Sequence, residues 1–116
     1  MIDIRQYVDR LGRNPFERWF ESLDHGTQAR VVAFLDRLER GNFSAAKSEG
    51  EGVFELRLDF GPGYRIYFGK DGERLVILLG GGSKKRQQTD IERARALWKE
   101  YKARKREGKH AAHKKL

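Results

Sequence analysis

The sequence predicts an α+β fold in which a small antiparallel β-sheet packs against an N-terminal helical hairpin and a C-terminal helix. Three observations predict this fold. Residues 53–86 contain segments in which apolar and polar side chains alternate with the period of a half-buried strand. Two segments before them and one after them repeat apolar residues with the spacing of an amphipathic helix. The length of 116 residues fits one compact domain.

The sheet is predicted from three consecutive strands. Residues 54–60 form the first, and its apolar face consists of Phe54, Leu56, Leu58 and Phe60. A Gly-Pro-Gly turn leads into the second strand, residues 64–68, and Asp71-Gly72 predicts a tight hairpin turn into the third. That third segment, residues 75–79, is continuously apolar, which suits a strand covered on both faces, although a short run also fits a buried helix segment.

Pairing across the Gly-Pro-Gly turn predicts which side chains share the second face of the sheet. Arg57 would lie opposite Tyr67, and Asp59 opposite Arg65. The result is a basic and aromatic strip on the face opposite the apolar one. We expect part of this strip to be covered and the remainder to bind a partner that carries phosphates.

The helices are predicted from apolar stripes and from residues that favour helix ends. Residues 2–8 form a short first strand, after which Asn14 and Pro15 are suited to begin a helix. Its stripe consists of Phe16, Trp19, Phe20 and Leu23. The second helix covers about residues 27–40, with a stripe of Val31, Phe34, Leu35 and Leu38. These helices form the expected hairpin over the apolar face.

The last helix is expected to begin between Lys85 and Asp90 and to cover the second face of the sheet. Its stripe consists of Ile91, Ala94, Leu97, Trp98 and Tyr101. Residues 41–52 are small or polar and indicate a loop. We therefore predict a folded domain over residues 1–102, followed by a basic, disordered tail over residues 103–116.

The composition restricts the classes of function. The formal net charge is +8, and thirteen Lys and Arg residues face only four acidic residues from position 84 onward. This balance favours nucleic acid over anionic membrane as the partner. The chain has no cysteine and three scattered histidines, so we predict neither a metal site nor another cofactor. No apolar stretch is long enough to span a bilayer and the N-terminus lacks a signal peptide, which predicts a cytoplasmic protein without a membrane partner.

A glycine-rich segment followed by cations is the first candidate site. Gly80, Gly81 and Gly82 precede Ser83, Lys84, Lys85 and Arg86. Backbone amides and cations beside a helix start suit phosphate binding, but a flexible connection with solvated lysines fits the same pattern. The spacing matches neither a Walker loop nor a dinucleotide-binding turn.

The basic strip of the sheet is the second candidate site, and it also has two interpretations. Arg65 either pairs with Asp59 across the hairpin or binds phosphate. Tyr67 either stacks on Arg57 or stacks with a base. Composition favours neither interpretation over the other.

The order of these elements and three motifs resemble a known family. The motifs are E-L-R-L-x-x-G-P-G-Y-R-I-Y-F, L-V-I-L-L-G-G-G-S-K-K and x-D-I-x-x-A. They resemble the RelE/ParE superfamily of bacterial toxins, and in particular its HigB-like branch of phage-derived addiction-module killer proteins. The resemblance covers about residues 2–102 and is most specific over residues 54–94. It implies a RelE-like fold and the toxin of a type II toxin-antitoxin module.

The resemblance also implies an activity and partners. The activity would be that of a ribosome-dependent mRNA endonuclease that inhibits translation without a metal, by attack of a ribose 2′-hydroxyl on the adjacent phosphate. The partners would be the ribosome with its mRNA, and an antitoxin whose helix-turn-helix domain carries the complex to operator DNA. By motif, the catalytic residues are Arg57, Arg65 and Lys84, with Glu55 as the candidate base, and the RNA-binding residues are Tyr67, Lys85 and Arg86.

Two other functions remain open from the sequence. A ParE-like toxin of the same fold inhibits DNA gyrase without cleaving RNA, and fold alone does not separate the two activities. A non-catalytic nucleic-acid-binding module, or a degenerate toxin, would also fit the basic tail. The matching region lacks the histidine that some relatives use, and Asp59 stands where several relatives are basic, so the general acid and base are not assigned by the motif.

Overall fold

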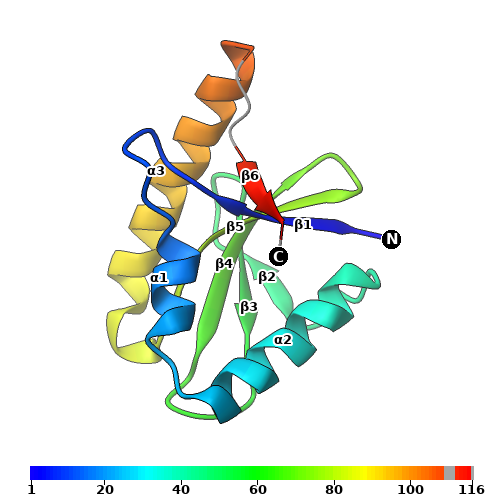
Figure 1. Ribbon diagram of the computed structural model, residues 1–116, viewed down its shortest axis with the longest axis vertical. Coiled ribbons are helices and arrows are strands. Elements are labelled where there is room, and N and C mark those ends of the chain that lie inside the picture. Colours follow the sequence, from blue (N-terminus) through cyan, green and yellow to red (C-terminus); the bar gives the residue numbers. More distant parts are fainter. Residues whose placement is uncertain (109–111, 116) are drawn as a thin grey trace.

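The computed structural model describes residues 1–108 and the backbone of residues 112–115. Figure 1 shows the elements in chain order: β1 (Asp3–Tyr7), α1 (Pro15–Glu21), α2 (His25–Glu39), β2 (Ala46–Ser48), β3 (Val53–Arg57), β4 (Arg65–Asp71), β5 (Leu75–Gly82), the 3₁₀ helix η1 (Lys84–Arg86), α3 (Gln87–Arg106) and β6 (Ala112–Lys115). Within the described residues, the strands form one sheet in the order β2-β3-β4-β5-β1-β6. The predicted α+β class is confirmed.

The sheet is antiparallel except where β1 meets β5. These two strands run parallel, with Asp3 to Gln6 opposite Leu75 to Leu78. A parallel pair needs a long crossover. Here the crossover between β1 and β5 contains α1, α2, β2, β3 and β4. The pairing places β1 inside the sheet between β5 and β6, next to a strand some seventy residues later in the chain.

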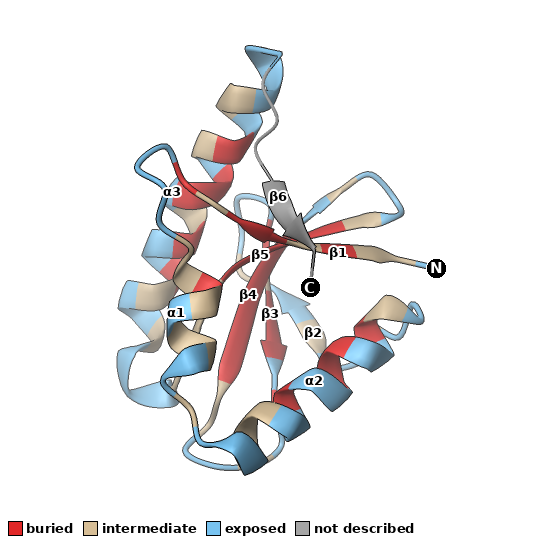
Figure 2. Cartoon of the chain, in the orientation of Figure 1, coloured by how far each residue is buried: buried red, intermediate tan, exposed pale blue. Residues whose placement is uncertain are grey.

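Helices cover both faces of the sheet, as expected from the apolar stripes of the N-terminal helices and of the last helix. The apolar sides of β3 and β4 contact α1 and α2 in one cluster that includes Leu56, Ile66, Phe68, Phe16 and Leu35. The opposite face contacts α3 in a second cluster that includes Tyr67, Ile77, Leu79, Leu97 and Trp98. Figure 2 shows that burial is concentrated on the strands and on the inward sides of the helices.

The first helix begins where the sequence predicts. Asn14 is the N-cap of α1, its side chain accepts a hydrogen bond from the backbone N–H of Glu17, and Pro15 occupies the first turn. α2 begins at His25, two residues earlier than expected, because the Asp24 side chain caps it by accepting from the Thr27 N–H.

The predicted hairpin of α1 and α2 is not accurate. The 7-residue α1 lies along β5, and the 15-residue α2 crosses the same face at a wide angle to it (Figure 1). Trp19 explains the position of α1, because its ring packs directly on the backbone of Gly81 in β5. Each helix therefore contacts the sheet instead of running along the other.

The register predicted between the first and second strands, which are β3 and β4 in the structure, is also wrong. Arg57 lies opposite Arg65, and Glu55 lies opposite Tyr67, a shift of two residues. The cause is a wider turn, in which Leu58 donates its backbone N–H to Tyr64 O across a five-residue loop. A shift of two leaves each side chain on its predicted face, which is why the apolar face was predicted correctly.

Other differences concern the lengths of strands and loops. β5 continues through the three glycines to Gly82, so they are not a flexible connection. The β4–β5 turn has three residues between Asp71 and Leu75, not two. Residues 46–48, inside the predicted loop, form β2 on β3.

The C-terminal segment differs from the predicted disordered tail. α3 continues to Arg106, four residues beyond the predicted domain boundary at residue 102. The backbone of β6 runs antiparallel to β1, with Arg5 opposite Lys115. The part of the predicted tail at residues 109–111 and 116 lies outside the described residues.

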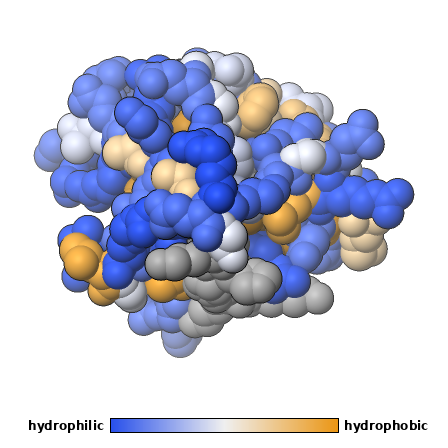
Figure 3. Space-filling model, turned by 90° about the horizontal axis from the view of Figure 1, so that it is seen from above, coloured by the Kyte–Doolittle hydropathy of each residue, from blue (hydrophilic) through white to orange (hydrophobic). Residues whose placement is uncertain are grey.

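The surface is mainly polar where Figure 3 shows it. Hydrophilic side chains dominate that face, and apolar side chains occur only in separate small areas. Among the described residues, none of the helices combines the length and apolarity that crossing a bilayer requires.

Candidate nucleic-acid interface

One end of the sheet brings the predicted cationic residues together. Arg57 ends β3, Arg65 begins β4, and Gly82 ends β5; these residues are neighbours across three strands. Because the strands are antiparallel, the end of β3, the start of β4 and the end of β5 all meet at this edge. Lys84 to Arg86 follow β5 within two residues.

The β3–β4 loop holds the basic helical turn η1 against this end of the sheet. Lys84 donates its backbone N–H to Pro62 O at 3.3 Å. Gly63 permits the contact: it has φ of +73°, and a Cβ there would lie 3.0 Å from Lys84 Cβ. The Gly-Pro-Gly motif thus positions Lys84, Lys85 and Arg86 beside the strands.

Beneath this surface lies a buried ion pair. Arg65 Nε is 3.3 Å from Glu55 Oε1, and their side chains are 5% and 1% exposed. Gln87 Nε2 donates to the same carboxylate oxygen at 2.9 Å, and Arg65 Nη1 donates to Gly63 O at 2.7 Å. Arg65 therefore pairs with Glu55 and not with Asp59, and the candidate base Glu55 is not a free carboxylate.

Tyr67 is also buried. Its side chain is fully enclosed between the sheet and α3, and its hydroxyl has no hydrogen-bond partner in the described part of the chain. Burial, together with the nearby charges of Glu55 and Asp90, raises the pKa of Tyr67 well above its ordinary range. In this conformation the ring has no free face on which a base could stack.

Four of the predicted residues remain accessible. Arg57, Lys84, Lys85 and Arg86 are all exposed. We call these four residues the basic edge. The structure brings them together around Arg65, which lies below the surface, so phosphate would meet the basic edge first.

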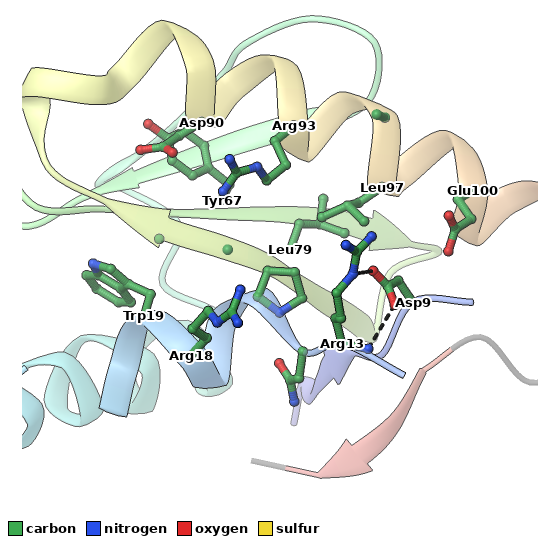
Figure 4. A pocket seen from close by; sticks show the side chains of 15 residues that line it. Asp9, Arg13, Arg18, Trp19, Tyr67, Leu79, Asp90, Arg93, Leu97 and Glu100 are labelled. Atoms are coloured by element: carbon green, nitrogen blue, oxygen red, sulfur yellow. Dashed lines mark hydrogen bonds and ion pairs between the residues drawn. The ribbon is translucent and has the colours of Figure 1, made fainter. Parts of the chain in front are cut away.

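A second feature, which sequence reasoning missed, is a cleft of about 730 Å³ between α1 and α3. Figure 4 shows Arg18 and Trp19 on the α1 side, Asp90, Arg93 and Glu100 on α3, and Leu79 on the sheet between them. Gly80 and Gly81 form part of its floor. The glycine run was the available signal, but the sequence indicated either a phosphate-binding segment or a flexible connection there.

Two of the carboxylates that line the cleft accept hydrogen bonds from other residues of the chain. Asp9 accepts from the backbone N–H groups of Leu11 and Arg13 and from Arg13 Nε. Burial opposes its ionisation, but these hydrogen bonds outweigh burial and hold the pKa of Asp9 below its usual range. Glu100 accepts from the Tyr7 hydroxyl and from the Arg10 N–H.

The third carboxylate, Asp90, lies in the first turn of α3 against β5. A Cβ on Gly82 would be 2.0 Å from Asp90 Oδ2, so any side chain at position 82 would force the Asp90 carboxylate to move. Burial raises the pKa of Asp90, and the charges of Arg86 and Arg93 oppose that shift. Asp90 thus lines the cleft and also interacts electrostatically with Arg86 of the basic edge.

Comparison with known proteins gives a family. The sequence model of "Phage derived protein Gp49-like (DUF891)" matches residues 18–102. The chain belongs to this Gp49-like family. The family is toxin-like and is related to the RelE/ParE type. The chain is also similar to an uncharacterized protein of Haemophilus influenzae, with 43% identity over 86 residues that cover 73% of this chain and 87% of the relative.

The Gp49-like match covers the basic edge completely and the cleft only in part. Every residue of the basic edge, and the Glu55–Arg65 pair beneath it, lies inside the matched region. Most of the cleft does as well, but Asp9, Arg13, Asn14 and Pro15 precede it. The basic edge is therefore built entirely from the part of the chain that defines the Gp49-like family.

Proposed function

We propose that this Gp49-like protein is the toxin of a type II toxin-antitoxin module, of the HigB-like kind, and that it acts as a ribosome-dependent mRNA endonuclease. One observation carries the proposal: four exposed cations gather at one end of the sheet around a buried arginine. A cluster of this kind suits a phosphate that gains negative charge during the reaction. The family relationship to toxins supports the same conclusion.

The proposed reaction needs no cofactor. The ribose 2′-oxygen attacks the adjacent phosphorus, its proton passes to a base, and the bond from phosphorus to the 5′-oxygen breaks. The leaving 5′-oxygen takes a proton, which leaves a 2′,3′-cyclic phosphate and a 5′-hydroxyl. Arg57 and Lys85 with Arg86 would hold the phosphate, and Lys84 would donate the proton to the leaving oxygen.

The buried pair has a different role in this proposal. Glu55 is enclosed and already accepts from Gln87 and faces Arg65, so it positions Arg65 instead of taking the 2′-hydroxyl proton. Asp59, in the β3–β4 loop, is an exposed carboxylate at the same end of the sheet. Comparing Asp59→Asn with Glu55→Gln therefore tests which carboxylate acts as the base.

The experiment is induction of the protein in bacterial cells, with measurement of protein synthesis and mapping of new RNA 5′ ends. We expect rapid arrest of translation with cuts inside translated mRNA. Arg57→Ala with Lys84→Ala should lower cleavage about 100-fold or more, as expected when groups that stabilise a developing anion are removed. Lys99→Ala, an exposed cation on α3 outside the basic edge, is the matched control and should cleave like the parent.

Other outcomes would identify a different function. Growth arrest with a DNA-damage response and no new RNA ends would indicate a ParE-like gyrase inhibitor. Absence of arrest would indicate a non-catalytic nucleic-acid-binding module or a degenerate toxin. The proposal also includes an antitoxin with a helix-turn-helix domain that binds operator DNA; co-expression of the adjacent gene should restore growth and allow the two proteins to be purified together.

A further inference from the structure

β5 has an edge that is unpaired over its last four residues. β1 pairs with β5 only as far as Leu78, and it ends at Tyr7 before the chain turns toward α1. β5 continues to Gly82 with β4 on its other side. Within the described residues, no strand therefore pairs with residues 79–82 on the β1 side. Such an edge offers alternating N–H and C=O groups to an added strand.

The glycines make this edge accessible between two helices. A Cβ on Gly81 would lie 2.3 Å from the Trp19 ring, so its absence lets α1 pack flat on the strand. The nearest atom to a Cβ on Gly80 would be Pro15 Cβ at 3.9 Å. The edge thus forms the floor of the cleft, and α1 and α3 form its walls (Figure 4).

The cleft also has polar groups available for a ligand. Arg18 and Arg93 are exposed and enter from opposite walls (Figure 4). Asp9 and Glu100 already accept hydrogen bonds within the fold, so their charges are largely compensated. The fully buried Tyr67 side chain also lines the cleft, and its hydroxyl has no partner in the described region. A buried polar group of this kind is uncommon unless something completes it.

We propose that this cleft binds an extended acidic segment of a partner protein, which adds a strand to β5 at residues 79–82 and places carboxylates near Arg18 and Arg93. The edge favours peptide over nucleic acid because a peptide satisfies both the N–H and the C=O groups of a strand, whereas a phosphate chain accepts only from the donors. The inference does not depend on ribonuclease activity.

The test uses the full chain and short fluorescein-labelled peptides in which valine alternates with glutamate, glutamine or lysine. The glutamate peptide should bind, the glutamine peptide should bind more weakly, and the lysine peptide should not bind. Methylation of alternate amide nitrogens in the glutamate peptide should abolish binding, because it removes the donors that pair with a strand edge. In NMR titrations the amide signals of Gly80 to Gly82 should shift with the glutamate peptide.

Variants test the two arginines. Arg18→Glu and Arg93→Glu should each weaken binding of the glutamate peptide about tenfold, as expected for loss of a charge-assisted hydrogen bond. Lys99→Glu makes the same charge change on an exposed α3 position that does not line the cleft, and it should change binding less than about twofold. Circular dichroism verifies that each variant is folded. If a variant is unfolded, the peptide series, measured on the parent protein, tests the proposal without it.

Three results would overturn the proposal. Equal binding of the methylated and unmethylated peptides would show a charged surface without strand addition. Stronger shifts of the same glycine amides by a single-stranded RNA of mixed sequence would make the cleft a nucleic-acid site. Failure of every peptide to shift those amides in the folded protein would leave the cleft without a peptide-binding role.

Discussion

Glu55 and Arg65 carry opposite charges at two positions that are almost closed to solvent. Removing charges from water costs several kcal/mol for each ion, and a close partner with further hydrogen bonds offsets that cost. Gln87 supplies such a bond to Glu55, and Gly63 O supplies one to Arg65. Beneath the basic edge, the pair therefore joins β3, the start of β4 and the start of α3.

Removing either member of this pair should destabilise the protein strongly. We expect Arg65→Ala or Glu55→Ala to lower the free energy of unfolding by about 3–5 kcal/mol, because each leaves an uncompensated buried charge. The double change to leucine at both positions should recover most of the loss, and Arg57→Ala, an exposed control, should stay within about 0.5 kcal/mol of the parent. Urea unfolding of the four variants measures these differences.

An Arg65→Ala protein as stable as the parent would contradict this account and would return Arg65 to a purely catalytic role. The comparison also affects any toxicity assay. Loss of toxicity in Arg65→Ala has two physical causes, a missing phosphate contact and a weakened fold, whereas loss in Arg57→Ala has only the first. Stability measurements on both variants are therefore needed to interpret the toxicity of either.

At the scale of the element, the sequence was informative where the interactions are local. The alternation of Phe54, Leu56 and Leu58 predicted the buried face, and Asn14 with Pro15 predicted the start of α1, because strand period and helix capping depend on adjacent residues. The hairpin register and the angle between α1 and α2 depend on loop conformation and on tertiary packing. Neither is encoded in a short window of sequence.

The same distinction separates the two candidate sites. The basic edge was predicted because Arg57, Arg65 and Lys84 to Arg86 lie within one short stretch of chain and match motifs of known toxins. The burial of Arg65 and Glu55 was not predictable, since it depends on where the first turn of α3 lies over Glu55. The cleft was missed because it arises where β1 ends beside β5, a pairing between residues far apart in the sequence.

Trp98 fixes α3 to the sheet, and this contact requires glycine in β4. A Cβ on Gly69 would lie 2.4 Å from the Trp98 ring, which is also stacked on Tyr101 with centroids 4.9 Å apart. We expect Gly69→Ala to lower the free energy of unfolding by about 1–3 kcal/mol, because a strand backbone and a stacked ring have little room to move. Urea unfolding measures the loss.

Gly26→Ala is the matched control for that prediction. Gly26 lies in the first turn of α2, where a Cβ would meet only Asp24 Oδ1 at 3.4 Å. Alanine is favoured over glycine in helices by up to about 1 kcal/mol, so this variant should equal or exceed the parent in stability. If Gly69→Ala and Gly26→Ala behave alike, the contact with Trp98 does not limit the position of α3.

For the molecule as a whole, three tyrosines lie between the sheet and α3. Tyr7, Tyr67 and Tyr101 belong to one cluster and are almost fully buried. Burial, with further contributions from Glu100 and opposed by Arg104, raises the pKa of Tyr7 to about 12. Burial also raises the pKa of Tyr67, and burial with the hydrogen bond to Asp71 raises the pKa of Tyr101. The attachment of α3 therefore depends on three neutral phenols.

This arrangement predicts a loss of stability at alkaline pH. Below the unfolded-state pKa of about 10 the three phenols are neutral in both states, and their contribution is fully present. As pH rises above about 10, the unfolded chain releases these protons while the folded chain retains them. Stability should then fall by up to about 1.4 kcal/mol per pH unit for each tyrosine, until pH passes the folded-state pKa. Urea unfolding at a series of pH values, with phenolate absorbance as a second signal, measures this slope.

Tyr67→Phe provides the decisive comparison because the Tyr67 hydroxyl has no partner within the described residues. The variant keeps the ring and removes a buried polar group, so near neutral pH it should be at least as stable as the parent. Above about pH 10 it should lose stability with a smaller slope, since one proton fewer is released on unfolding. Lysines that lose their charge in the same range affect parent and variant alike, and the difference between them isolates Tyr67. An unchanged slope in Tyr67→Phe would mean that this phenol ionises equally in the folded and unfolded chains, and that the enclosure of Tyr67 by α3 does not persist in alkaline solution.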